Sequence, residues 1–260
     1  MNIMKKMKYI LKKRSGRGAK GRISIRHQGG REKRFYRIID DKRDKKDIWA
    51  KVLDLEYDPN RNSRLAYLLY GDGEKRYIIA PMGLKPGDKV IASDSAPIEK
   101  GNCLPLDKIP VGAQIYNIEI TPGKGGQMVK GAGSFAVLHG KELNNVLVKL
   151  PSGEIRRFRK DSCAVIGQVS NMEARNVRIK NAGTRRHMGV RPTVRGVAMH
   201  PNAHPHGGGE GRSHVGMKFP KTPWGKKAVG KTRRKRKYSD HLIIQGRKPG
   251  KHSNPSKMRS

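Results

Sequence analysis

The positive charge of this chain is concentrated at its two ends. Residues 1–34 contain 13 Lys and Arg residues against one acidic residue, and residues 177–260 contain 22 against two. The 142 residues between them contain 23 Lys and Arg residues and 18 acidic ones, the balance of an ordinary soluble domain. Because a chain with a formal net charge of +37 repels itself, we expect it to bind a polyanion. The charge pattern predicts a folded middle between two basic ends that bind this partner.

Nucleic acid, an anionic membrane surface and an acidic protein are the three polyanions to consider. The sequence has no run of ~18 apolar residues for a membrane-spanning helix, and its start resembles neither a secretory signal nor a mitochondrial transit peptide. Its two cysteines, Cys103 and Cys163, are too few for a disulfide framework or a Cys-based zinc site. We expect both to be buried in a protein of a reducing compartment, and we expect no membrane partner.

The middle of the chain has the pattern of short β-strands. Segments rich in Ile, Leu, Val and Tyr are separated by Gly and Pro turns, and helical periodicity is almost absent. The sequence GDGE at 71–74 is a hairpin signal because Asp-Gly accepts positive φ. The predicted strands form two groups, 35–39, 48–56, 65–70, 76–80 and 89–92, and then 113–120, 134–138, 146–150, 155–159 and 164–169. The pattern predicts an all-β protein with two small barrels and a break near residues 93–110.

The two ends have a different composition. They are basic and rich in Gly, and no periodicity is visible from about residue 200 onward. Segments of this kind bury too little apolar surface to fold alone. They are either solvated, disordered tails or arms that enter folded RNA and become ordered there. Their position on both sides of a folded middle favours arms, because Gly lets the backbone approach phosphates that Lys and Arg neutralise.

One segment of the chain indicates a family. The sequence RPTVRGVAM at 191–199 leads into HPHGGGEGR at 204–212. This run resembles the signature of the second protein of the large ribosomal subunit, in its bacterial-type form. The resemblance covers residues 16–245, and further motifs match in the same order at 21–23, 56–61, 73–78, 80–81, 109–112, 122–127, 150–154 and 222–225.

The resemblance implies a fold and a division into four parts. It implies an OB-like barrel followed by an SH3-like barrel, in agreement with the two groups of strands. We therefore expect a basic N-terminal arm at 1–33, an OB-like RNA-binding barrel at 34–96, an SH3-like barrel at 97–176 and a basic C-terminal arm at 177–260. The fold class is thus all-β, with long irregular arms.

The resemblance also implies a function without catalysis or cofactors. Members are structural constituents of the large ribosomal subunit, primary binders of its ribosomal RNA, and support subunit assembly and association. Their C-terminal arm runs through the RNA toward the peptidyl-transferase centre, and residues 204–209 match the loop nearest to it. The implied partners are large-subunit ribosomal RNA, neighbouring ribosomal proteins and small-subunit ribosomal RNA at a subunit bridge. The implied location is the cytoplasmic ribosome, with an organellar ribosome left open.

The chain departs from the family pattern at several positions. Ala203 and His200 stand where the family has Asp and Asn, which weakens any role for a His–Asp pair in chemistry. Asp41 stands where the family tends to have Phe, and Trp49 where it tends to have Pro.

The expected RNA-binding residues lie in the barrels and in the C-terminal arm. Arg and Lys are expected to contact phosphates, and the His/Gly loop at 204–209 to pack and hydrogen-bond to RNA. Trp224 is expected to stack or to anchor the arm, because no local core can bury it. The full set is Arg61, Lys124, Arg191, Arg195, His204, His206, Gly207, Gly208, Gly209, Arg212, Lys221 and Trp224. The aromatic residues of the first barrel, Trp49, Tyr57, Tyr70 and Tyr77, fit either base stacking or a core.

Two other functions remain open from the residues alone. Five histidines between 187 and 214 could ligate zinc in a metal-dependent hydrolase, but the segment lacks Cys and a rigid scaffold. A generic single-strand binder or RNA chaperone would use the OB-like barrel without the His/Gly loop. The Gly-rich run at 122–127 lacks the order of a nucleotide-binding P-loop, so NTP binding is not expected. We expect neither a metal site nor a catalytic residue.

Overall fold

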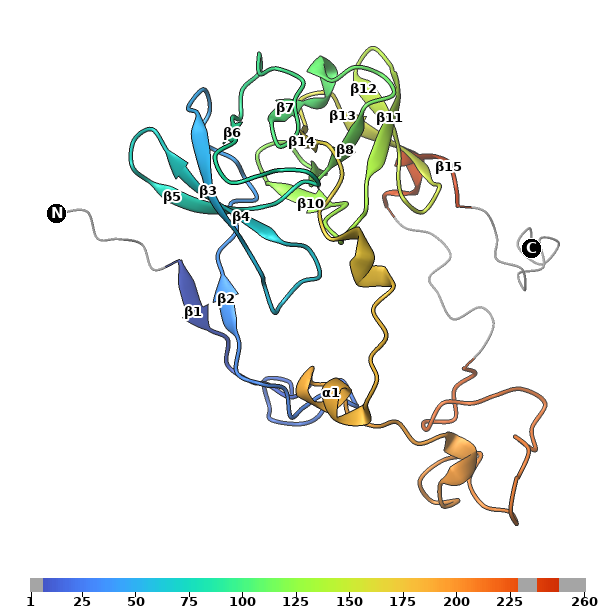
Figure 1. Ribbon diagram of the computed structural model, residues 1–260. Helices are drawn as coiled ribbons and strands as arrows, with labels where there is room; N and C mark the ends of the chain where they lie inside the picture. Colours follow the sequence, from blue (N-terminus) through green and yellow to red (C-terminus); the bar gives the residue numbers. More distant parts are fainter. Residues whose placement is uncertain (1–6, 229–237, 248–260) are drawn as a thin grey trace. The chain divides into compact units, whose positions relative to one another are not determined.

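The computed structural model describes residues 7–228 and 238–247 (Figure 1). These residues form two compact units. The barrel unit contains residues 7–11, 34–178 and 241–247, and the arm unit contains residues 12–33, 179–228 and 238–240. Each end of the chain therefore contributes to both units.

The first barrel is built on a four-stranded antiparallel sheet in the order β5-β4-β3-β6. Its strands are β3 (Ala50–Glu56), β4 (Leu65–Tyr70), β5 (Lys75–Ile79) and β6 (Lys89–Val90). The central strand β4 is the most buried, as its apolar sequence requires.

The hairpin between β4 and β5 closes as its sequence predicts. The backbone N–H of Tyr70 donates to the carbonyl of Glu74 at 2.9 Å, and Gly73 has a φ of 82°. The Asp72 carboxylate accepts the backbone N–H of Glu74 at 3.1 Å. The Asp-Gly hairpin signal is therefore confirmed.

A two-stranded ribbon extends from the first barrel. It consists of β1 (Lys8–Ile10) and β2 (Phe35–Arg37), which pair antiparallel. Downstream of β2, Ile39 forms a parallel bridge with Tyr77 on β5. β1 lies inside the arm that the sequence predicts to be irregular, so that prediction is wrong for residues 8–10.

A partly buried carboxylate fixes the ribbon to the barrel. Glu56, at the end of β3, accepts hydrogen bonds from Lys8 Nζ at 2.9 Å, Arg37 Nε at 2.8 Å and the hydroxyl of Tyr77 at 2.7 Å. Burial acts to raise the pKa of Glu56, but the hydrogen bonds from Tyr77, Lys8 and Arg37 outweigh it and lower the pKa. Residues from β1, β2 and β5 therefore meet at one charged group.

The second barrel is built on a seven-stranded sheet in the order β15-β13-β12-β11-β8-β14-β7. All of its neighbouring strands pair antiparallel. A short ribbon of β9 (Ile118–Glu119) and β10 (Gly126–Met128) accompanies it. The strands of the sheet are β7 (Cys103–Pro105), β8 (Gln114–Tyr116), β11 (Ala136–Lys141), β12 (Asn145–Lys149), β13 (Ile155–Arg159), β14 (Cys163–Ile166) and β15 (Ile243–Gln245).

The two barrels share part of their core. Each has its own apolar cluster, around Leu68 in the first barrel and around Leu138 in the second. A third cluster combines residues of both, namely Leu65, Tyr77, Ile79, Ala92, Cys103, Tyr116, Val165 and Val169. The buried hydroxyl of Tyr116 donates to the carbonyl of Ile79 at 3.0 Å. Each fully buried large side chain contributes about 1.5–3 kcal/mol, so this shared cluster holds the barrels together.

All ten predicted strands are present, and the all-β prediction is confirmed. The predicted strand 113–120 is interrupted, because Asn117 adopts a φ of 50° and separates β8 from β9. The additional strands are β1, β7, β10 and β15. β15 lies in the C-terminal region where the sequence shows no periodicity, and it is held by pairing with β13.

Helices are few and short among the described residues. One α-helix is present, α1 (Ala182–His187), with the 3₁₀ turns Leu106–Lys108, Met172–Arg175, Gly196–Ala198 and Asp240–Leu242. None of these helices has the length and apolar character needed to cross a membrane.

The cysteines and barrel aromatics divide between core and surface. Cys103 is buried, as predicted. Cys163 is only partly buried, so the prediction that it is buried is wrong. Tyr70 and Tyr77 are 3% and 2% exposed and belong to the core. Trp49 and Tyr57 are exposed, which leaves them free to contact a partner.

Candidate nucleic-acid interface

The arm unit carries a large excess of positive charge. Its residues 12–33, 179–228 and 238–240 contain 19 Lys and Arg residues and three acidic ones, Glu32, Glu210 and Asp240. Glu32 lies 3.3 Å from His187 in an exposed pair. The carboxylates are too few to neutralise the cations, so the compensating charge must come from a partner.

The arm unit is held together mainly by its backbone. The N-terminal segment runs beside α1 and the residues after it, as Figure 1 shows. Gly29 N–H donates to the carbonyl of Gly189 at 2.9 Å, and Arg191 N–H donates to the carbonyl of His27 at 3.0 Å. Of the arm-unit residues that the structure describes, only Gly29 and His204 are buried. The basic ends therefore pair with each other while burying little apolar surface, as their composition predicts.

His204 is the centre of the His/Gly loop. It is 8% exposed, and its Nδ1 accepts the backbone N–H of His206 at 3.0 Å. A Cβ on Gly196 would lie 2.5 Å from the His204 ring, so only glycine fits there. Burial, together with the nearby charges of His206 and Arg26, lowers the pKa of His204. His204 is therefore a neutral hydrogen-bond acceptor in the loop, and its contact with RNA stays a prediction.

His206 connects this loop to the turn that carries Trp224. Its Nε2 accepts the backbone N–H of Lys221 at 2.8 Å, and its ring centre lies 4.6 Å from that of His204. The turn is closed by Gly225 N–H, which donates to the carbonyl of Thr222 at 2.9 Å. The two histidines thus position a segment some 15 residues away in sequence.

The three glycines after His206 are required by the packing of the loop. A Cβ at Gly207 would lie 2.4 Å from the carbonyl of His200, and one at Gly208 would lie 2.9 Å from Pro201. Gly208 and Gly209 also have positive φ values of 89° and 94°. The N–H groups of Gly207 and Gly208 already donate to carbonyls within the loop. These two N–H groups are therefore occupied in this conformation.

Trp224 presents an exposed ring beside a cation. The side chain is 75% exposed, and the guanidinium of Arg26 lies 5.5 Å from its ring centre. The neighbouring His27 Nδ1 lies 3.0 Å from the carbonyl of Pro192. The N-terminal segment thereby brings a cation to a ring 198 positions further along the chain, a pair suited to a nucleobase and its phosphate.

The other predicted RNA-binding residues lie in both units. Arg191, Arg195 and Arg212 are exposed in the arm unit, and Lys221 is partly buried there. Lys124 is exposed in the barrel unit, in the loop between β9 and β10. Arg61 is more constrained, because its guanidinium forms an ion pair with the buried Asp58 at 3.2 Å.

Arg26, His27 and Gly196 are members of this site that sequence reasoning missed. Gly196 lies inside the family signature, but nothing in its residue type points to the His204 ring. Arg26 and His27 meet their partners only through long-range pairing, for which a single sequence carries no signal. Among the described residues, no three His, Cys, Asp or Glu side chains form a group that could hold a metal ion.

Comparison with known protein families accounts for both barrels and most of the arm. Residues 4–92 match the family model described as Ribosomal Proteins L2, RNA binding N-terminal domain. Residues 99–225 match the model described as Ribosomal Proteins L2, C-terminal domain. The two matches confirm the OB-like and SH3-like assignment of the barrels and the resemblance seen in the sequence. The chain belongs to the ribosomal protein L2 family, whose members are RNA-binding structural constituents of the large ribosomal subunit.

Proposed function

We propose that this protein is a primary binder of large-subunit ribosomal RNA whose arm unit fills a crevice in that RNA. The observation that carries the proposal is the arm unit itself, whose described residues include 19 Lys and Arg residues and three acidic ones, and of which only two residues are buried. In this role the protein supports subunit assembly, subunit association and the RNA around the peptidyl-transferase centre. It acts without catalysis, and its partners include neighbouring ribosomal proteins and small-subunit ribosomal RNA at a subunit bridge.

Exposed cations and glycines of the arm supply the contacts in this proposal. Arg191, Arg195 and Arg212 bind phosphates, because an Arg fork matches phosphate oxygens in two places. Lys221 adds a further positive charge, and Gly209 lets the RNA backbone approach the loop.

Trp224 and the histidines have separate tasks. Trp224 stacks on an unpaired base, with Arg26 at the adjoining phosphate. His204, His206, Gly207 and Gly208 keep the loop folded, and His206 also orients the Trp224 turn. The RNA-facing surface of the loop is therefore pre-shaped before binding.

The barrel unit makes a second set of contacts. Lys124 is free to reach a phosphate from its exposed loop. Arg61, held by Asp58, offers only those donors that the ion pair leaves unused. The proposed place of action is the cytoplasmic ribosome, with an organellar ribosome as the alternative.

Sedimentation of the tagged chain in lysate at moderate salt, followed by sequencing of crosslinked RNA, tests the proposal. Co-migration with the large subunit and crosslinks confined to its ribosomal RNA are the expected result. Crosslinks spread over messenger and transfer RNA at the top of the gradient would favour a general single-strand binder instead. Removal of residues 200–212 should reduce incorporation into large subunits, whereas a general binder should keep its RNA affinity.

A further inference from the structure

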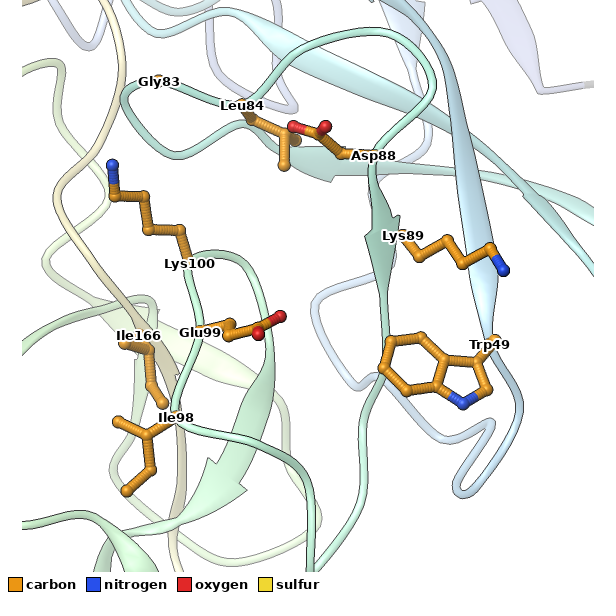
Figure 2. A pocket seen from close by; sticks show the side chains of 9 residues that line it. All are labelled: Trp49, Gly83, Leu84, Asp88, Lys89, Ile98, Glu99, Lys100 and Ile166. Carbon is orange, nitrogen blue, oxygen red and sulfur yellow. The ribbon is translucent and has the colours of Figure 1, made fainter.

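A shallow hollow of about 660 Å³ lies at the junction of the two barrels, and nothing described so far uses it (Figure 2). One wall comes from the first barrel and its β5–β6 loop, and the other from the segment that leads to β7 and from β14. Its lining residues are Trp49, Gly83, Leu84, Asp88, Lys89, Ile98, Glu99, Lys100 and Ile166. A volume of this size accommodates a single nucleotide.

Trp49 gives the hollow an exposed aromatic wall. Its side chain is 46% exposed, unlike the core residues Tyr70 and Tyr77 of the same barrel. A second hollow of about 320 Å³ is also lined by Trp49 and Lys89, together with Lys51. The indole is therefore accessible from two hollows, as a ring that stacks on bases must be.

Glu99 gives the hollow one available carboxylate. Figure 2 shows this carboxylate pointing into the space that the Trp49 indole borders. Among the described residues no hydrogen-bond or ion-pair partner holds it. The other acidic residue, Asp88, already accepts the backbone N–H of Lys85 at 2.8 Å. Glu99 is thus the carboxylate of the hollow whose two oxygens are both unoccupied, and it can accept from a ligand with N–H donors.

Two lysines balance the charge of the two carboxylates in the lining of the hollow. Lys89 lies beside Trp49, and Lys100 lies at the rim near Gly83. Neither forms an ion pair with a described residue. A cationic peptide would meet two like charges here, whereas a nucleotide brings both a negative phosphate and N–H donors. The two unpaired cations and the one unpaired carboxylate therefore match the phosphates and the N–H donors of a nucleotide.

We infer that this hollow binds one unpaired guanine nucleotide of an RNA strand, an inference that rests on the proposed RNA-binding function. The base stacks on Trp49, and the Glu99 carboxylate accepts its N1–H and its 2-amino group. Guanine is the common base that offers two adjacent donors on its Watson–Crick edge, which matches a carboxylate with two acceptor oxygens. Lys89 and Lys100 neutralise the flanking phosphates.

Fluorescence of Trp49 tests the inference in the full-length protein. Both tryptophans emit, so every protein carries Trp224→Phe to leave Trp49 as the sole reporter. The probes are three single-stranded tetraribonucleotides, identical except for guanine, inosine or uracil at one position among uracils. Titration at about 0.5 M salt weakens phosphate binding by the arms. Quenching of Trp49 gives the dissociation constant of each probe. We expect this constant to be about tenfold lower for the guanine probe than for the uracil probe, since one stacked and paired base contributes on this order.

Inosine separates pairing from stacking, because it lacks the 2-amino group. The inosine probe should bind with an affinity between those of the other two. Glu99→Gln should reduce the preference for guanine over uracil to less than about threefold, since the amide presents an N–H to a guanine donor. The matched control is Glu173→Gln, an exposed carboxylate of the same unit outside the hollow, which should keep the preference. Thermal unfolding checks that both variants fold.

Three outcomes would overturn the inference. They are equal quenching by all probes, a guanine preference that survives Glu99→Gln, and crosslinks from residue 49 to a protein in purified particles. Binding of the unsubstituted protein, which keeps Trp224, to a large-subunit ribosomal RNA fragment is measured in parallel. Retained binding there with no response of Trp49 rejects the guanine pocket alone, whereas loss of both rejects the proposed function.

Discussion

Because Gly196 has no side chain, the ring of His204 can be buried against it in a segment that has almost no apolar core. The ring occupies the space where a Cβ at residue 196 would stand. The Nδ1 of this ring also accepts a hydrogen bond from the backbone N–H of His206. A small residue and a neutral imidazole therefore replace the apolar cluster that this part of the chain lacks.

Gly196→Ala should unfold the His/Gly loop locally while leaving the barrels intact. The new methyl group would overlap the His204 ring, so the ring must leave its site. Hydrogen exchange should become faster at residues 196–208 and stay unchanged in β3 and β4. Gly183→Ala in α1 is the matched control, because a Cβ there meets open space and alanine favours a helix. Equal exchange in both variants would contradict the close contact.

Acid should open the same loop. Because burial lowers the pKa of His204 below its ordinary value of about 6.5, the folded loop favours the neutral ring. Its contribution to stability is complete above about pH 6.5 and is lost as the pH falls toward the lowered pKa. NMR chemical shifts of the residue 206 amide, followed from pH 8 to pH 5, should report this transition. His214→Gln should leave the transition in place, and His204→Gln should abolish it.

At the scale of elements, short strands in the terminal segments depend on partners far away in sequence. β15 is three residues long and pairs with β13 through Ile155 with Gln245 and Arg156 with Ile243. A strand of this length has no stability of its own. β13 is an edge that β15 covers, and an uncovered edge exposes its backbone groups to water.

Truncation after residue 240 should therefore expose β13. Peptides that cover 155–159 should exchange amide hydrogens faster, because the edge loses its hydrogen-bonded neighbour. Truncation after residue 247 is the control, since it retains β15. Identical exchange in the two truncated proteins would argue against pairing of β13 with β15 in solution.

The elements that could be predicted from the sequence contain residues that favour them locally. The β4–β5 hairpin follows from Gly73, which has the positive φ that such turns demand, and from Asp72, whose carboxylate accepts the backbone N–H of Glu74. The division of the 113–120 segment was not predictable, because Asn117 is a polar residue whose positive φ depends on its place between β8 and β9. β7 and β10 escaped prediction because they are three residues long and lie next to Pro or Gly.

The candidate site was predictable only in part, because some of its residues meet only after distant segments pair. The exposed cations and Trp224 follow from composition and from the family motifs. The pairing of Arg26 with Trp224 and of His27 with Pro192 depends on how two distant segments meet. The exposure of Trp49 likewise depends on which aromatic residues of the barrel enter the core. Residue type alone does not decide which of them do so.

At the scale of the whole molecule, charge rather than apolar area sets the strength of RNA binding. If about six phosphates are neutralised, log K should fall against log salt with a slope near roughly −4 for single-stranded RNA or −5 for a duplex. Filter binding of a ribosomal RNA fragment from about 50 to 300 mM salt measures this slope. Replacing Arg191, Arg195 and Arg212 together by Gln should make the slope shallower by about two to three. A flat salt response of the unmodified protein would contradict the electrostatic argument.

The arm unit combines two segments that lie far apart in the sequence, and this has a consequence for synthesis. His27 meets Pro192 across 165 residues, so the N-terminal segment leaves the ribosome long before its partner exists. At about 5–20 residues per second, the delay is on the order of 10–30 s. During that interval the segment is an unpaired polycation in a compartment that contains many nucleic acids. Newly made chains therefore need either protection by a chaperone with an acidic surface or immediate capture by their own RNA.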